Sequence, residues 1–461
     1  MTFKPHNYQA NCIEFLQDNE CAGVFADPGL GKTVMVLQLL DNLYWTTPGP
    51  RVLLIAPLRV IYSVWPAEIR KWGFHHHLTH SILHGKGKEQ RAHDDAVIHL
   101  LNVENIFWHF EDLPQYDVLV IDESSKFKNW SSKRTKVLKR HLDAFERRII
   151  LTGTPSPNSL MDLYSQCFIL DKGAALGRNI TAYRNRFFYP TNFRNFVEWQ
   201  PKSNADQSIR RAIAPLVNRI DAESNLDIPP LVNHTIKIDL PPRVQKTYEG
   251  FEKRLFAEIE NEQFALSSAA AAYNTCRQIA NGRLYRPPEP LSLAPKDPDR
   301  QVLSLHSLKI EALRELLGEL QGKPLLVAYH YKHDLAQLRA EFGDDVPTIG
   351  GGTTAKQGDA IIRRWNRGEI PVLLGHPQSM GHGVNLQQGG RDVAWFSLTD
   401  NLENYIQFNR RIYRQGAPGV TRVHHLIVRK TVDEAIMARL ESKDKSQRAL
   451  LDALSQYGRG K

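Results

Sequence analysis

The chain has 461 residues, which is too long for one hydrophobic core and long enough for two α/β domains with a connector. Apolar residues make up 42% and charged residues 24%, as in an ordinary globular protein, and no apolar run approaches the roughly 18 residues of a membrane span. Lys and Arg number 59 against 50 Asp and Glu, a formal charge of +9, which favours an acidic partner but is equally explained by a solvated basic surface.

The cysteines and the N-terminus indicate in which cellular compartment the protein is expected. The four cysteines, Cys12, Cys21, Cys167 and Cys276, are scattered without the spacing of metal ligands. We therefore expect reduced thiols in a cytosolic protein, and neither disulfides nor a zinc site. The N-terminus is polar by residue 4, so we expect no signal peptide and a cytoplasmic location, in a prokaryote or a phage-infected host.

The first third of the chain alternates short apolar, β-branched runs with helical patterns. Strands are expected at residues 23–26, 51–56, 117–122 and 148–152, with helices at about 34–43 and 57–72. Continuous apolar strands separated by helices indicate a parallel sheet that is covered on both faces.

The same alternation returns late in the chain. Strands are expected at residues 324–329, 371–375, 392–396 and 422–428, and helices at about 334–341, 355–367, 402–413 and 432–454. The predicted fold class is therefore α/β, with two parallel-sheet lobes of similar design.

Between the two lobes the character of the sequence changes. Ile228-Pro-Pro230 and Leu240-Pro-Pro242 contain breakers and predict a linker, residues 244–282 favour helix, and residues 286–298 are Pro-rich and predict a loop. We therefore divide the chain into an N-terminal lobe at 1–227, a linker with a helical connector at 228–302, and a C-terminal lobe at 303–461.

A phosphate-binding loop is predicted where the first strand meets the first long helix. It comprises Pro28, Gly29, Leu30, Gly31, Lys32 and Thr33. Such a loop presents backbone N–H groups to phosphate oxygens, with Lys32 at the β- and γ-phosphates of ATP and Thr33 on Mg²⁺. Ala26 stands where the strict pattern has Gly, but a chance Gly-Lys-Thr would not have a strand before it and a helix after it.

Two adjacent carboxylates, Asp122 and Glu123, end an apolar strand. Paired carboxylates at such a position need a cation nearby, so we assign Asp122 to Mg²⁺ through water and Glu123 to orienting the attacking water. A plain acidic turn is the alternative, which the phosphate loop upstream disfavours. Thr152 and Thr154 close the next strand, where hydroxyls can bond both carboxylates and an incoming backbone, although turn chemistry alone would also explain them.

Further candidates lie at the two ends of the chain. Gln9 precedes the phosphate loop, and its amide can pair with N6 and N7 of adenine. Arg411 and Arg414 are three residues apart, which would put both on one helix face. Arginine fingers that stabilise charge on the γ-phosphate contribute about 10³–10⁵ in rate. Both arginines could instead face solvent or nucleic acid.

The surroundings of the two arginines also carry candidates. Gly383 and Asn385 offer flexible backbone and an amide, and Gln407 begins the arginine segment. From Asn404 to Val432 there are six Lys or Arg residues and no acid, a run that suits a phosphate backbone or a bound triphosphate.

In this order and spacing the motifs resemble those of the superfamily 2 helicases and translocases, most closely the Swi/Snf-type branch. The resemblance runs from Tyr8-Gln9 to Val432-Asp-Glu-Ala-Ile436. The most specific stretches are Asp27-Pro-Gly-Leu-Gly-Lys-Thr33, Trp65-Pro-Ala-Glu68, Asp122-Glu-Ser-Ser-Lys-Phe-Lys-Asn129, Leu151-Thr-Gly-Thr-Pro-Ser-Pro-Asn-Ser-Leu160, Gly381-His-Gly-Val-Asn-Leu386, and Gln407 with Arg411, Arg414 and Gly416.

The resemblance implies two RecA-like lobes of the P-loop NTPase fold, hydrolysis of ATP with Mg²⁺ in the cleft between them, and nucleic acid across both lobes. Members of the branch usually track along duplex DNA, often without separating its strands. The sequence departs from the family pattern at Ser125, where His is common, at Asp400-Asn-Leu402, and at Ala417. These departures, and the lack of appended chromatin-reading domains, favour a minimal prokaryotic or phage-type motor over a chromatin remodeller.

The resulting hypothesis is an ATP-dependent DNA helicase or translocase that uses ATP and Mg²⁺ and binds nucleic acid, with duplex DNA as the expected partner and no membrane. Two alternatives stay open. One is an RNA-directed ATPase of the same superfamily, and the other is a non-motor, ATP-gated nucleic-acid clamp.

Overall fold

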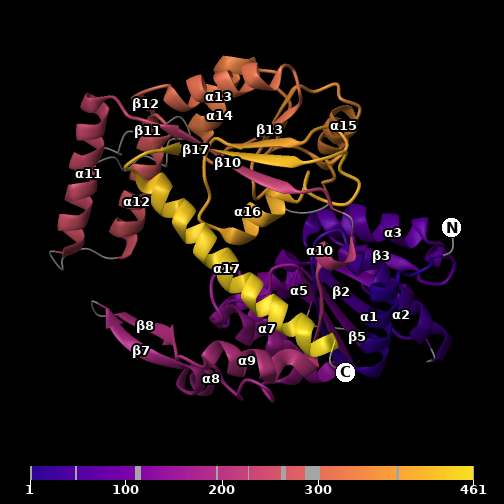
Figure 1. The fold of residues 1–461 in the computed structure, drawn as a ribbon. Helices are drawn as coiled ribbons and strands as arrows, with labels where there is room; N and C mark the ends of the chain where they lie inside the picture. The colour runs from indigo at the N-terminus through magenta and orange to yellow at the C-terminus, as the bar shows by residue number, and fades with distance from the viewer. Residues whose placement is uncertain are drawn as a thin grey trace. The chain divides into compact units, whose positions relative to one another are not determined.

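The chain folds into two units, each built around a parallel sheet (Figure 1). The computed structural model describes residues 3–46, 49–109, 116–193, 196–226, 228–260, 266–285, 302–380 and 384–459. Unit 1 comprises Met1–Asp227 with Lys443–Lys461, and unit 2 comprises Ile228–Ser442. The predicted α/β class with two parallel-sheet lobes is confirmed.

The sheet of unit 1 has the strand order β3-β4-β2-β5-β6-β1-β9, and every pairing in it is parallel. Its strands are β1 (Cys21–Ala26), β2 (Val52–Ala56), β3 (His80–Leu83), β4 (Ile98–Asn102), β5 (Val118–Asp122), β6 (Arg147–Thr152) and β9 (Val217–Ile220). The central strands are buried along their length, as expected for a sheet with helices on both faces. A separate antiparallel hairpin joins β7 (Phe188–Phe193) to β8 (Phe196–Pro201).

The helices of unit 1 connect these strands. They are α1 (Asn7–Asp18), α2 (Lys32–Thr46), α3 (Trp65–Lys71), α4 (Lys88–Arg91), α5 (Ile106–His109), α6 (Lys133–Arg140), α7 (Met161–Asp171), α8 (Ile180–Phe187), α9 (Ala205–Ile213) and α10 (Ala222–Asn225). Short helical turns lie at η1 (Val60–Val64), η2 (Phe74–His76), η3 (Val103–Asn105), η4 (Ser124–Phe127), η5 (Leu142–Ala144) and η6 (Ala214–Leu216).

The sheet of unit 2 has the order β10-β17-β16-β13-β15-β14, again with parallel pairings. Its strands are β10 (Leu231–Ile238), β13 (Leu325–Ala328), β14 (Thr348–Ile349), β15 (Val372–Gly375), β16 (Asp392–Trp395) and β17 (Thr421–Val428), and a small hairpin pairs β11 (Arg283–Tyr285) with β12 (Val302–Ser304). The helices are α11 (Pro242–Glu260), α12 (Leu266–Ala280), α13 (Leu308–Leu320), α14 (Lys332–Phe342), α15 (Ala355–Asn366), α16 (Leu402–Asn409) and the first part of α17 (Val432–Arg459), whose residues from Lys443 onward belong to unit 1.

The segment between the two Pro-Pro pairs corrects one expectation. We predicted a linker there, but residues 231–238 form the edge strand β10, which pairs with β17 over its whole length. The prolines bound the strand at its two ends and do not interrupt it, which is where a strand tolerates them. The Pro-rich stretch at 286–298 lies outside the described residues.

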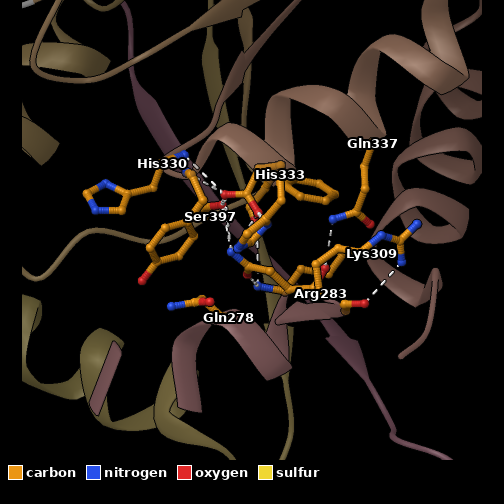
Figure 2. A network of polar contacts seen from close by, with 12 residues as sticks. Gln278, Arg283, Lys309, His330, His333, Gln337 and Ser397 are labelled. Carbon is orange, nitrogen blue, oxygen red and sulfur yellow. Dashed lines mark hydrogen bonds and ion pairs between the residues drawn. The ribbon is translucent and has the colours of Figure 1, made fainter. Parts of the chain in front are cut away.

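The end of α12 is fixed to the sheet of unit 2 by a buried polar network. Asn281 donates from Nδ2 to Ser397 Oγ (2.8 Å) and to Asp334 Oδ1 (3.2 Å), and its Oδ1 accepts from Lys309 Nζ (2.9 Å). Lys309 Nζ also lies 2.8 Å from Asp433 Oδ2. Figure 2 shows this network around Lys309 and Ser397. Because the charges are paired and the Asn281 amide makes hydrogen bonds, these polar groups can be buried without a large loss of stability. The helix α12 therefore belongs to unit 2.

Among the described residues, none of the helices combines the length and the apolar character that crossing a membrane requires. The four cysteines are free thiols.

The histidines of unit 2 predict how its stability depends on pH. Burial lowers the pKa of His306, His330 and His425 to about 4. The folded state therefore binds these protons less readily than the unfolded chain, whose histidines titrate near 6.5. Stability is fully present above about pH 6.5 and is lost as the pH falls toward 4. We expect the melting temperature to fall over this window.

His425→Gln tests this prediction at one site. His425 is 1% exposed, and its Nε2 lies 2.9 Å from the Tyr405 hydroxyl. Glutamine retains a hydrogen-bonding group there but takes no proton, so the variant should show a shallower fall in melting temperature between pH 6.5 and 4. If the melting temperature depended on pH as steeply in the variant as in the unsubstituted protein, the buried His425 would not contribute to the pH dependence.

Candidate active site

The phosphate loop lies between β1 and α2 and adopts a turn that needs glycine. Gly29 (φ 95°) and Gly31 (φ 79°) are in the left-handed region, which glycine enters without steric cost. Lys32 Nζ donates to the carbonyls of Ala26 (2.6 Å) and Asp27 (3.2 Å). The ammonium group is thus held over the loop by two carbonyl oxygens that phosphate oxygens can replace. Thr33 follows in the first turn of α2.

Gln9 packs directly on this loop. Its Oε1 accepts from the backbone N–H of His6 (3.0 Å), and its Nε2 donates to the Leu30 carbonyl (3.2 Å). A Cβ atom at Gly31 would lie only 2.7 Å from Gln9 Nε2, so the Gln9 side chain would have to move, and the positive φ itself favours glycine there. Gln9 is buried and braces the loop. Its pairing with adenine stays a prediction.

A buried ion pair that the sequence did not reveal anchors the start of the loop. Both terminal nitrogens of Arg219 lie 3.1 Å from Asp27 Oδ1, and Asp27 Oδ2 accepts from the backbone N–H of Ala222 (3.0 Å). Arg219 also donates to the Phe25 and Ile220 carbonyls, so the charge is paired and further hydrogen-bonded. Asp27 and Arg219 are 192 residues apart, which is why no local pattern predicted the pair.

The carboxylate pair lies at the end of β5, two strands from the phosphate loop, with β6 between β5 and β1. Glu123 has φ 67° and ψ 59°, a strained conformation for a residue with a side chain. Its Oε1 accepts from Ser125 Oγ (2.9 Å) and from Thr152 Oγ1 (3.4 Å). The turn into η4 thus directs Glu123 toward the end of β6, and Ser125 stands as a donor to it where the family pattern has His.

Thr152 links Glu123 to the following loop. Its hydroxyl accepts from the backbone N–H of Thr154 (3.0 Å) while it donates to Glu123. A Cβ atom at Gly153 would lie 3.2 Å from Pro28 Cδ, so this loop also touches the phosphate loop. The structure therefore brings together the predicted residues of unit 1, including Thr152, Thr154 and Glu123.

Electrostatics show that Lys32 and the carboxylates share one environment. Burial lowers the pKa of Lys32, and the charges of Glu123, Asp122 and Asp27 oppose this shift. Asp122 and the Thr33 hydroxyl supply the oxygen ligands that Mg²⁺ prefers, so these residues fit a Mg²⁺–nucleotide complex.

Gln166 is a second contact that the sequence did not suggest. It is fully buried on α7, where its Oε1 accepts from Ser124 Oγ (2.7 Å) and its Nε2 donates to the Pro155 carbonyl (2.6 Å). Ser124 follows the carboxylate pair and Pro155 follows Thr154, so one amide ties the two predicted motifs together.

The arginine segment of unit 2 corrects another expectation. α16 ends at Asn409, so Arg411 and Arg414 lie in the turns after it and not on one helix face. Arg411 is 8% exposed and donates to the carbonyls of Gln407 (2.8 Å) and Val384 (3.2 Å). Its guanidinium thus holds the segment after residue 383 against the end of α16.

Arg414 is less buried and contacts Asn385, whose Oδ1 accepts from its Nη1. Burial, followed by the nearby charge of Arg410, lowers the pKa of Arg414. Gln407 is buried and donates from Nε2 to Glu403 Oε1 (3.5 Å). The structure therefore gathers Asn385, Gln407 and the two arginines, whereas Gly383 lies outside the described residues.

The positive charge expected around this segment is partly neutralised by acidic residues from elsewhere in unit 2. Asp392 accepts from Arg422 at 2.6 and 2.7 Å, and Arg429 is paired with Asp239. These acids lie outside the cationic run in the sequence, so the run itself did not reveal them. Arg422 and Arg429 are thus committed to ion pairs within unit 2.

Comparison with known proteins gives the family. A family model described as the SNF2-related domain matches residues 8–282, which is more than half of the chain. The chain belongs to the SNF2-related family. A second model, the helicase conserved C-terminal domain, matches residues 308–416. This SNF2-related protein is therefore an ATP-hydrolysing helicase or translocase core with two RecA-like lobes.

The chain is also similar to individual proteins and to solved structures. Putative protein p41 of Acyrthosiphon pisum secondary endosymbiont phage 1 is 34% identical over 98% of this chain and 99% of that protein. The putative ATP-dependent helicase/translocase YwqA of Bacillus subtilis is 24% identical over 96% of this chain, which spans only 48% of that protein. The Sulfolobus solfataricus SWI2/SNF2 ATPase core in complex with dsDNA aligns over 99% of this chain and 95% of that chain, with 20% identity and a TM-score of 0.45.

The different surroundings of the two arginines predict different costs of removing them. Arg411→Ala leaves two carbonyls without their donor in a buried position, so we expect a loss of about 1–3 kcal/mol in unfolding free energy. Arg414→Ala removes a more exposed contact to one side chain and should cost less than about 1 kcal/mol. Urea unfolding of both variants measures the difference, and equal stability of the two would contradict the bracing role of Arg411.

Proposed function

We propose that this SNF2-related protein is an ATP-driven translocase that moves along duplex DNA. The observation that carries the proposal is the gathering of the phosphate loop, Asp122, Glu123 and Thr152 at one edge of the unit 1 sheet, in a chain whose second half matches the helicase C-terminal family. A simple nucleotide-binding protein has no need of a second lobe or of its arginine segment.

In this proposal unit 1 binds and activates the nucleotide. Lys32 exchanges its two carbonyl partners for the β- and γ-phosphate oxygens, while the backbone N–H groups of the loop bind the remaining phosphate oxygens. Thr33 and Asp122 would hold Mg²⁺, and the bound ion would supply positive charge to the phosphates. Glu123 accepts a hydrogen bond from the attacking water, and Ser125 and Thr152 fix the direction of its carboxylate.

Unit 2 contributes the positive charge that completes the site in this proposal. Because Arg411 already donates to two carbonyls, we assign it mainly to holding the segment of Val384 and Asn385 in place. Among the described residues Arg414 donates to the Asn385 side chain and is more exposed than Arg411, so we assign its charge to the γ-phosphate. Hydrolysis then frees the γ-phosphate as inorganic phosphate, and its departure removes the negative charge that Arg414 binds, which gives the lobes a reason to part.

A basic surface on unit 1 supports a polyanionic partner. From Ser124 to Leu142 the sequence has seven Lys or Arg residues and no acid. Lys133, Lys136 and Arg140 are exposed, and their spacing along α6 puts them on one face of that helix. Such a surface binds phosphate backbones without regard to sequence. The Swi/Snf-type resemblance of the motifs favours duplex DNA.

ATPase measurements test the choice of nucleic acid. We expect duplex DNA to stimulate turnover more than single-stranded RNA does, with a stimulation that weakens as salt rises because backbone contacts release counterions. Lys32→Ala should abolish turnover with either. Stronger stimulation by RNA would favour an RNA-directed enzyme, and ATP-dependent binding without turnover would favour a clamp.

Movement is tested separately from hydrolysis. A translocase displaces a third strand from triplex DNA but leaves a forked duplex paired, whereas a helicase also unwinds the fork. We expect displacement without unwinding. Unwinding of the fork would contradict the translocase assignment, and failure of both assays alongside normal ATPase activity would contradict movement.

A further inference from the structure

The Trp65-x-x-Glu68 motif has no role in the mechanism above, yet it lies beside the active site. It begins directly after η1, a π-helical turn at Val60–Val64 that separates β2 from α3. π-helical turns are rare and recur at functional sites, because the extra residue turns the following side chains to a new direction. Here the residue that follows the turn is Trp65.

Trp65 reaches the carboxylate that we assign to Mg²⁺. Its side chain is fully buried, and the indole Nε1 donates to Asp122 Oδ2 at 3.0 Å. An indole has a single N–H donor, and burying it without a partner would be costly. The bond to an ionised carboxylate is stronger than one to a neutral oxygen. The rotation of the Asp122 carboxylate is therefore fixed by a rigid, enclosed side chain.

We propose that Trp65 is a positioning residue for Mg²⁺ binding. With Oδ2 of Asp122 bound to the indole, the carboxylate is held in one orientation in which it would serve the ion or its water ligands. Groups that orient a metal ligand in this way typically change metal affinity or activity by about 10–100-fold when they are removed. The inference rests on the proposed function, since it assumes that Asp122 serves Mg²⁺.

The same motif supplies a matched control. Trp72 Nε1 donates to Glu68 Oε2 at 2.6 Å, which is again an indole bonded to a carboxylate. Glu68 and Trp72 are one turn apart at the end of α3, and neither belongs to the phosphate loop or the carboxylate pair. Trp→Phe at either position removes one such bond and a similar volume, but only Trp65 contacts Asp122.

The experiment measures how Mg²⁺ and nucleotide binding depend on each other. Calorimetric titration with a non-hydrolysable ATP analogue, over a series of Mg²⁺ concentrations and in EDTA, gives the Mg²⁺ affinity of the complex without turnover. We expect Trp65→Phe to weaken Mg²⁺ binding by about 10-fold or more while the affinity for the analogue in EDTA stays unchanged. Trp72→Phe should match the unsubstituted protein in both.

A second variant separates positioning from a general packing defect. In an Asp122→Asn background the ligand charge is already reduced, so adding Trp65→Phe should weaken Mg²⁺ binding much less than it does alone. Equal effects in both backgrounds, an unchanged Mg²⁺ affinity in Trp65→Phe, or an equal loss in Trp72→Phe would each overturn the proposal. If the unsubstituted protein shows no Mg²⁺-dependent nucleotide binding, the proposed function itself fails.

Discussion

The hydrogen bonds that converge on Glu123 are the constraint on which the rest of the active site depends. Glu123 occupies a left-handed backbone conformation that costs energy for any residue with a side chain. Two hydroxyls, from Ser125 and Thr152, then fix its carboxylate. Because the strain and the hydroxyl bonds act on the same residue, the carboxylate has one direction before nucleotide binds. Catalysis that depends on orienting water gains from such preorganisation.

The phosphate loop is also fixed before nucleotide binds, by contacts from distant parts of unit 1. Gln9 caps α1 and binds the loop at Leu30, while Arg219 binds its first residue, Asp27. β9, which carries Arg219, is the last strand of unit 1 before the chain enters unit 2 at Ile228. Because the carboxyl ends of parallel strands gather at one edge of the sheet, residues from distant parts of the chain can contact the loop there.

Local patterns in the sequence predicted β1, β2, β5 and β6 in unit 1, β13, β15, β16 and β17 in unit 2, and the motif order that marks the family, but they missed the other strands of both sheets. They failed where the structure depends on the position of a strand in the sheet, on where a helix ends, or on contacts between residues far apart in the sequence. The prolines around residues 231–238 suggested a linker because prolines break central strands, but β10 is an edge strand. The spacing of Arg411 and Arg414 suggested one helix face, but α16 ends at Asn409. Trp65 and Asp122 are 57 residues apart, so only the folded chain reveals that they are partners.

In the proposed mechanism the Thr152 hydroxyl couples Glu123, which would orient the attacking water, to the loop that follows β6. Thr152→Val retains the shape of the side chain and removes its bonds to Glu123 and to the N–H of Thr154. The most direct measurement is the ratio of DNA-stimulated to basal ATPase activity in this variant. We expect Thr152→Val to bind nucleotide normally, while its ratio of DNA-stimulated to basal ATPase activity falls toward one. A variant that is stimulated as strongly as the unsubstituted protein would contradict it.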